Sequence, residues 1–273
     1  MDFFNNIPPQ PEFPAAPVSL IAPPPVDDGK NAIVDLIDVG ILLLVVFVAS
    51  FFWQTVAFRI YMTRHPGQDR QAMEQAISHN AWFVLPLELS IYFILIGAMV
   101  LLAVVRHNTS LGRAIRWNPP RFGRAMTAVT GGIALAFCSE IVQVIFSRWI
   151  PKSLPIGEYF QDRSSALLLA GFGVLVAPVV EELFFRGFLY PALARWTGPA
   201  ISVIVTSAGF ALIHGGQLAY SLVPLLSILG VGVVLTLTRA ITKSVATTVV
   251  LHTAYNLTLF MQIFVGTHGF RNL

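Results

Sequence analysis

Charged side chains are scarce in this chain: Asp, Glu, Lys and Arg make up 11% of its 273 residues, whereas soluble domains usually carry about a quarter. The apolar residues, 55% of the chain, fall in runs long enough to cross a hydrocarbon core, which takes about 20 residues as a helix. These two features exclude a soluble globular domain. They predict an all-α fold, a polytopic bundle of transmembrane helices.

Cysteine is almost missing, since Cys138 is the only one. A single cysteine excludes an intramolecular disulfide and a thiolate metal site, and no histidine is its evident partner for nucleophilic catalysis. Positive charge is also limited. The net charge of +3 comes from arginine-rich loops rather than from a basic patch, which predicts no nucleic-acid binding. Five arginines between residues 106 and 124 are expected to contact lipid headgroups.

The first 30 residues hold eight prolines and lack the basic start and apolar core of a signal peptide, so they predict a disordered proline-rich tail. Residues 31–164 are expected to form N-terminal transmembrane helices and loops. Seven spans are predicted in the whole chain, or eight if one long run is broken. They cover residues 36–58, 81–105, 125–146, 165–190, 200–214, 218–238 and 244–265.

One predicted span, 165–190, carries Glu181, Glu182 and Arg186 within six residues. A charge at the centre of a membrane helix costs about 2.5–3.5 kcal/mol, so three cost roughly 7–10 kcal/mol. Charges kept at membrane depth are expected to be functional and buried against neighbouring helices. On a helix, Glu182 and Arg186 share one face and are expected to form an ion pair. Glu181 is rotated by about 100° and stays free.

Two polar clusters follow in apolar surroundings. His252 and Asn256 are four residues apart, so an imidazole and a carboxamide can donate to one point, as stabilising an oxyanion requires. His214 ends its span before a Gly-Gly turn that would admit water. With Glu181 as a base and His214 orienting a water, the clusters predict hydrolysis of an acyl compound without a covalent nucleophile. Taken singly, each histidine is equally compatible with an interhelical hydrogen bond.

The other polar residues are predicted to have structural roles. Glu88 and Glu140 have no companions at helical spacing, which favours solvation near the interface or interhelical hydrogen bonds. Arg239 falls in a short polar turn, and His107 lies in a loop and is assigned no role. Pro178 is expected to remove a backbone hydrogen bond and to bend its helix so that Glu181 points inward.

The clusters resemble the motifs of the CAAX protease and bacteriocin-processing family (CPBP, or Abi), which are intramembrane glutamate endopeptidases and include the type 2 CAAX prenyl endopeptidases. That family has two adjacent glutamates followed after three residues by arginine, then Phe-x-x-x-His, then His-x-x-x-Asn. The matching residues here are Glu181, Glu182 and Arg186; Phe210 and His214; and His252 and Asn256.

The resemblance implies that residues 165–273 form a CPBP-like catalytic helical core. It assigns water activation to Glu181 and His214 and the oxyanion hole to His252 and Asn256. The supporting residues are Glu182, Arg186 and Phe210. The expected substrate is a peptide or protein in the lipid bilayer, either membrane-embedded or lipidated. Prenylation, as in CAAX processing, is not implied for every member of the family. No metal or other cofactor is expected. The expected location is the bacterial cytoplasmic (inner) membrane.

Two other functions fit the same residues. A zinc-dependent membrane metalloprotease would use Glu181, His214 and His252 as ligands, although the sequence contains no His-Glu-x-x-His. A non-catalytic scaffold or a transporter would use the intramembrane charges for ion or proton pathways. Against a transporter, the sequence shows no pair of similar halves with interrupted helices.

Overall fold

The computed structural model describes residues 33–67, 71 and 80–271, so the tail predicted at residues 1–30 lies outside the described residues. Within these ranges the secondary structure is helical, as predicted. The α-helices are α1 (Leu36–Arg64), α3 (Ala81–Leu101), α4 (Leu111–Ala114), α5 (Phe122–Ile145), α6 (Arg163–Gly171), α7 (Ala177–Glu182), α8 (Tyr190–Ile213), α9 (Leu222–Thr242) and α10 (Val245–Gly266). Three π-helices, η1 (Leu102–Arg106), η4 (Phe172–Val176) and η5 (Leu183–Leu189), continue or interrupt them. The 3₁₀-helices are η2 (Ser147–Trp149), η3 (Pro155–Tyr159) and η6 (Gly216–Leu218).

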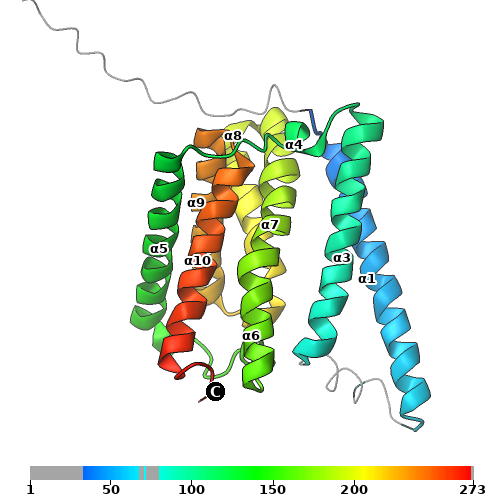
Figure 1. The fold of residues 1–273 in the computed structure, drawn as a ribbon, viewed down its shortest axis with the longest axis vertical. Coiled ribbons are helices and arrows are strands. Elements are labelled where there is room, and N and C mark those ends of the chain that lie inside the picture. The colour runs from blue at the N-terminus through cyan, green and yellow to red at the C-terminus, as the bar shows by residue number, and fades with distance from the viewer. Residues whose placement is uncertain (1–32, 68–70, 72–79, 272–273) are drawn as a thin grey trace, which may run out of the picture.

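Six helical runs of the described residues are long and apolar enough to cross a membrane. One of them, Arg163–Ile213, has 51 residues and would be about 75 Å long if straight, more than twice the hydrocarbon core. Its backbone leaves the helical region at Gly198 (φ 77°, ψ 167°), a conformation that glycine adopts without steric cost. The run rises through α6 and α7 and returns along α8 (Figure 1), so it contains two crossings and the bundle has about seven, as predicted.

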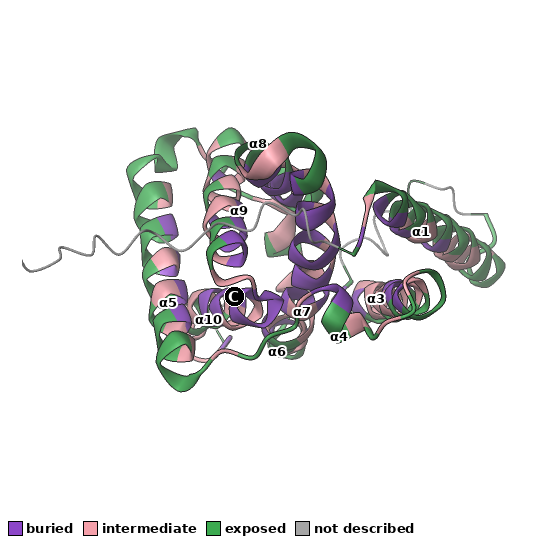
Figure 2. Cartoon of the chain, turned by 90° about the horizontal axis from the view of Figure 1, so that it is seen from above, coloured by how far each residue is buried: buried purple, intermediate pink, exposed green. Residues whose placement is uncertain are grey.

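The helices form a main bundle with a hairpin beside it. The hairpin consists of α1 and α3, and Figure 2 shows it next to the group made by α5 to α10. Hairpin and bundle share one apolar core, in which Leu42 and Met99 of the hairpin pack with Ile115, Val180 and Phe188. This core holds the hairpin against the bundle by burial of apolar surface and by close packing.

A polar clamp joins the start of α1 to the residues that follow α3. Asp38 is fully buried and is paired with Arg106 and with Nε2 of His107, the latter at 2.9 Å. Arg106 also pairs with Asp35 at 2.9 Å, and Asp35 caps the first turn of α1. Arg106 therefore bonds to protein carboxylates rather than only to lipid headgroups, and His107 has a partner that its position in a loop did not predict.

Close backbone contact fixes α10 against α5. Gly132 of α5 faces the α10 backbone, and a Cβ atom there would lie 2.4 Å from the carbonyl oxygen of Leu251. Only a glycine fits this contact, so the two helices approach each other as small residues allow in membrane bundles. This packing positions α10, which carries His252 and Asn256.

Candidate active site

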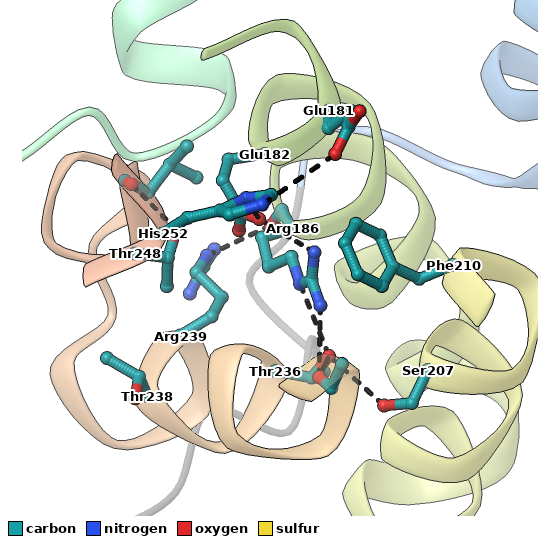
Figure 3. A network of polar contacts seen from close by, with 12 residues as sticks. Glu181, Glu182, Arg186, Ser207, Phe210, Thr236, Thr238, Arg239, Thr248 and His252 are labelled. Carbon is teal, nitrogen blue, oxygen red and sulfur yellow. Dashed lines mark hydrogen bonds and ion pairs between the residues drawn. The ribbon is translucent and has the colours of Figure 1, made fainter. Parts of the chain in front are cut away.

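A buried polar network surrounds Glu182 (Figure 3). Its Oε1 atom accepts hydrogen bonds from Nη1 of Arg186 at 2.7 Å and from Nδ1 of His252 at 2.9 Å. All three side chains are buried. The ion pair predicted from the four-residue spacing is present, and a buried carboxylate requires such a partner. Glu182 also fixes the orientation of the His252 ring, a contact that the spacing did not predict.

Arg186 also contacts two other helices, α9 and α8. Nη2 donates to the carbonyl oxygen of Gly232 at 3.0 Å, and Nε donates to the hydroxyl of Thr236 at 3.3 Å, both on α9. The guanidinium lies 4.6 Å from the centre of the Phe210 ring on α8, in cation–π contact. A planar cation with five donors suits this position, because its N–H groups donate in different directions while the rigid group also packs against an aromatic ring.

The π-helix η4 exposes a carbonyl group that positions Asn256. In η4 the N–H of Ala177 donates five residues back, to the carbonyl of Phe172. The next donor in this register would come from residue 178, but Pro178 has no N–H. The carbonyl of Gly173 is therefore left for Nδ2 of Asn256, which donates to it at 2.7 Å. One N–H of the carboxamide remains for the cavity that Asn256 lines.

The π-helix η5 repeats this arrangement with Arg239. Here the N–H of Tyr190 donates to the carbonyl of Phe185, and the next residue in the register, Pro191, has no N–H. The carbonyl of Arg186 instead accepts from Nε of Arg239 at 3.1 Å. Arg239 is buried within α9 and so does not lie in the polar turn predicted for it.

A spacing signal for Arg239 was present in the sequence. Gly232, Thr236 and Arg239 are separated by four and three residues, so they form one stripe on α9. All three contact η5.

Glu181 takes no part in these bonds. Its side chain is 12% exposed, and Oε2 lies 3.9 Å from Nε2 of His252. Neighbouring glutamates thus have separate environments: Glu182 is bonded inside the network, whereas Glu181 faces a cavity. This is the division that helical geometry predicted.

His214 caps the end of α8 and is held by Phe210 in two ways. Nδ1 of His214 lies 2.8 Å from the carbonyl oxygen of Phe210, and the two rings pack with their centres 5.0 Å apart. Since a carbonyl only accepts, Nδ1 carries the proton of this bond. In the neutral ring Nε2 is then an acceptor, and His214 lines the same cavity as Glu181.

The cavity has a volume of about 320 Å³. Glu181, His214, His252 and Asn256 all line it, although they come from three different helices. Much of the remaining lining is apolar and is contributed by these residues: Leu85, Ile156, Phe160, Leu169, Phe172, Ala177, Phe210, Ile228, Val231, Leu259, Phe260 and Ile263. The structure therefore brings together the four residues that the sequence assigned to one site.

Two intramembrane glutamates outside the motifs have different surroundings. Glu140 accepts a hydrogen bond from Nε2 of Gln262 at 2.6 Å, an interhelical bond as predicted. Glu88 instead lines the cavity, together with Tyr92. Because α3 is distant from the motifs in sequence, no spacing pattern links Glu88 to Glu181.

Metal ligation has no geometric support in the described part of the chain. No three His, Cys, Asp or Glu side chains there are arranged to hold a metal ion. Glu181, His214 and His252 line one cavity without forming a three-ligand set.

The site lies inside a segment with a known family pattern. Residues 163–258 match the family model described as Type II CAAX prenyl endopeptidase Rce1-like. This match confirms the resemblance to CAAX proteases. The Rce1-like segment, residues 163–258, runs from the first residue of α6 into α10 and contains Glu181, His214, His252 and Asn256. No curated protein and no solved structure matches the chain.

Proposed function

We propose that the protein is an intramembrane endopeptidase that hydrolyses a peptide bond with a water molecule activated by Glu181 and His214. One observation carries the proposal: the four polar motif residues Glu181, His214, His252 and Asn256 line a single cavity within the membrane-spanning bundle. The family match supports a CAAX-type intramembrane protease.

The water is held by two acceptors, the Glu181 carboxylate and Nε2 of His214. Glu181 takes a proton from the water as the oxygen attacks the carbonyl carbon of the scissile bond. The π electrons of the carbonyl move to its oxygen, which becomes an oxyanion. When this intermediate collapses, the C–N bond breaks and the proton on Glu181 passes to the leaving nitrogen. Collapse gives a carboxylic acid and an amine, and the Glu181 carboxylate is restored. The new acid then gives its remaining proton to the amine, which leaves a carboxylate and an ammonium group.

Asn256 and His252 stabilise the oxyanion by donating hydrogen bonds. The free N–H of Asn256 is preorganised, because the other one is bonded to the Gly173 carbonyl. His252 donates Nδ1–H to Glu182, so it donates from Nε2 as well only when the ring carries both protons. Glu182, Arg186 and Phe210 support the site by holding these rings in place.

The substrate is a peptide segment in or at the bilayer, because the reacting groups belong to membrane-spanning helices. The apolar lining suits a hydrophobic or lipidated chain. A prenylated CAAX-type peptide is the substrate that the family description names. The bacterial cytoplasmic membrane is the proposed location.

The test compares the membrane peptides of cells that produce the wild-type chain with those of cells that produce Glu181→Gln. Peptides that depend on the wild type should disappear with the variant, while protein levels stay similar because Glu181 makes no hydrogen bond in the network. Glu140→Gln is the matched control, since it removes an intramembrane carboxylate outside the cavity.

Identical peptide profiles for wild type and Glu181→Gln would refute the proposal and favour a scaffold.

If the profiles differ, treating the purified protein with a strong chelator separates the two hydrolytic mechanisms. A water activated by Glu181 keeps its activity, whereas loss of activity that added zinc restores would establish the metalloprotease alternative.

A further inference from the structure

One wall of the cavity belongs to α3, outside the Rce1-like segment. Its polar groups are the carboxyl of Glu88 and the hydroxyl of Tyr92, one helical turn later. The Tyr92 hydroxyl interacts with the Glu88 carboxylate, and the Tyr92 ring stacks on Phe172 with the ring centres 5.5 Å apart. Tyr92 therefore fixes Glu88 at the cavity surface and connects it to η4.

No cation of the described residues pairs with Glu88. Three other intramembrane acids have partners: Glu182 has Arg186, Asp38 has Arg106, and Glu140 has Gln262. The cavity lining contains two carboxylates, Glu88 and Glu181, and no lysine or arginine. These two carboxylates interact electrostatically with each other, which makes the cavity attractive to a positive group.

Glu88 lines the cavity from the first half of α3. It is seven residues, or about 10 Å, from the start of α3. The 3₁₀-helix η3 and the residue after it contribute Ile156 and Phe160 to the lining. Burial, together with the negative charges of Glu88 and Glu158, raises the pKa of Tyr159 on η3. The charge of Glu88 thus acts both on Tyr159 of η3 and on Glu181.

We propose that Glu88 forms a subsite that binds a basic side chain, lysine or arginine, of the substrate peptide. A carboxylate at membrane depth without a cation is costly, and a bound ammonium or guanidinium group removes that cost. Tyr92 is the positioning residue of this subsite. The inference rests on the proposed peptidase function for the identity of the ligand as a peptide, but not for the existence of the cation subsite.

The test measures equilibrium binding to the full chain in nanodiscs, in the Glu181→Gln background so that no probe is cleaved. The probes are N-palmitoyl-lysinamide and N-palmitoyl-norleucinamide, which share the acyl chain and differ in the amine. The Glu181→Gln protein with Glu88 intact should bind the lysine probe about tenfold more tightly than the norleucine probe. A charged hydrogen bond in a partly buried site provides a gain of this size. Adding Glu88→Gln should reduce this ratio to about one.

Three controls make the result specific. Glu140→Gln should keep the tenfold ratio, because Glu140 lies outside the cavity. Glu88→Asp keeps the charge and should retain a preference for the lysine probe, which also covers the case in which Glu88→Gln fails to fold. Glycine hexadecylamide presents an α-amine instead, and tighter binding of this probe than of the lysine probe would overturn the side-chain assignment.

An equal affinity for the two palmitoyl probes, or a preference that survives Glu88→Gln, would overturn the subsite. Because no turnover is measured, this outcome is independent of the peptide profiles that test the hydrolytic function. Absence of Glu181-dependent peptides with an intact lysine preference would refute the peptidase and leave the cation subsite in place.

Discussion

At the scale of single residues, the site separates adjacent carboxylates into two tasks. Glu182 bonds to Arg186 and His252 inside the protein, and Glu181 faces the cavity. Arg186 in turn holds α9 through Gly232 and Thr236. A change at Arg186 should therefore affect folding first, whereas a change at Glu181 should affect chemistry alone.

Arg186→Ala should lower the yield of folded protein, because it leaves Glu182 buried without its cation, at a cost of about 3–5 kcal/mol. Size-exclusion chromatography of a fluorescent fusion measures the folded fraction in detergent. Arg148→Ala is the matched control, since Arg148 stacks on Trp149 in η2, outside the cavity. The double variant Glu182→Gln/Arg186→Met removes both charges and should recover part of the yield. Normal yield with selective loss of hydrolysis would show that Arg186 acts in catalysis.

At the scale of helices, the π-helices η4 and η5 and the prolines that follow them position side chains of other helices. Both are followed by a proline at the position of the next donor, which leaves the carbonyls of Gly173 and Arg186 for Asn256 and Arg239. π-Bulges occur often at functional sites. The sequence offered Pro178 as a bend but not as the reason for a contact between Gly173 and Asn256, which are 83 residues apart.

Pro178→Ala tests this arrangement. The new N–H at residue 178 competes for the Gly173 carbonyl, so Asn256 should lose its fixed orientation and turnover should fall. The loss should stay below the roughly 10²–10³-fold effect of Asn256→Ala, the usual cost of one oxyanion donor. Pro86→Ala is the control, because Pro86 of α3 lines a different pocket. The quantity to measure is kcat on a peptide identified in the membrane profiles. Wild-type turnover of Pro178→Ala would contradict the role given to the Gly173 carbonyl.

Some of these features could be predicted from the sequence, and others could not. Apolar runs predicted the crossings, and the four-residue spacings predicted the Glu182–Arg186 pair. The π-helices could not be predicted, because a change of helical register leaves no trace in a run that is apolar on all sides. Glu88 was also missed as a cavity residue, because the contact between α3 and the Rce1-like segment is a tertiary one.

At the scale of the whole molecule, the cavity depends on how the hairpin of α1 and α3 stands against the main bundle. α3 contributes Leu85, Glu88 and Tyr92 to the lining, whereas the motif residues belong to the main bundle. The shared apolar core and the clamp of Asp35 and Asp38 with Arg106 lie together at one end of the hairpin. The clamp should therefore contribute to the stability of the assembled bundle.

Asp35→Asn tests the clamp through its pH dependence. The hydrogen bond from Arg106 holds the pKa of Asp35 at about 2, below its ordinary value of 3.8. A pKa that is lower in the folded than in the unfolded state stabilises the protein at pH values above the unfolded-state pKa. This contribution is lost as pH falls from about 4 towards 2. Asparagine also caps helices, so the substitution removes the charge and keeps the cap.

At pH 7 the wild type should melt at a higher temperature than Asp35→Asn. The lost ion pair is partly exposed, so it should contribute about 0.2–1 kcal/mol to the free energy of unfolding. Thermal melts in detergent from pH 7 to pH 3 should show the two curves converge. A difference that stays constant or widens with acidification would mean that the charge of Asp35 does not hold the hairpin closed.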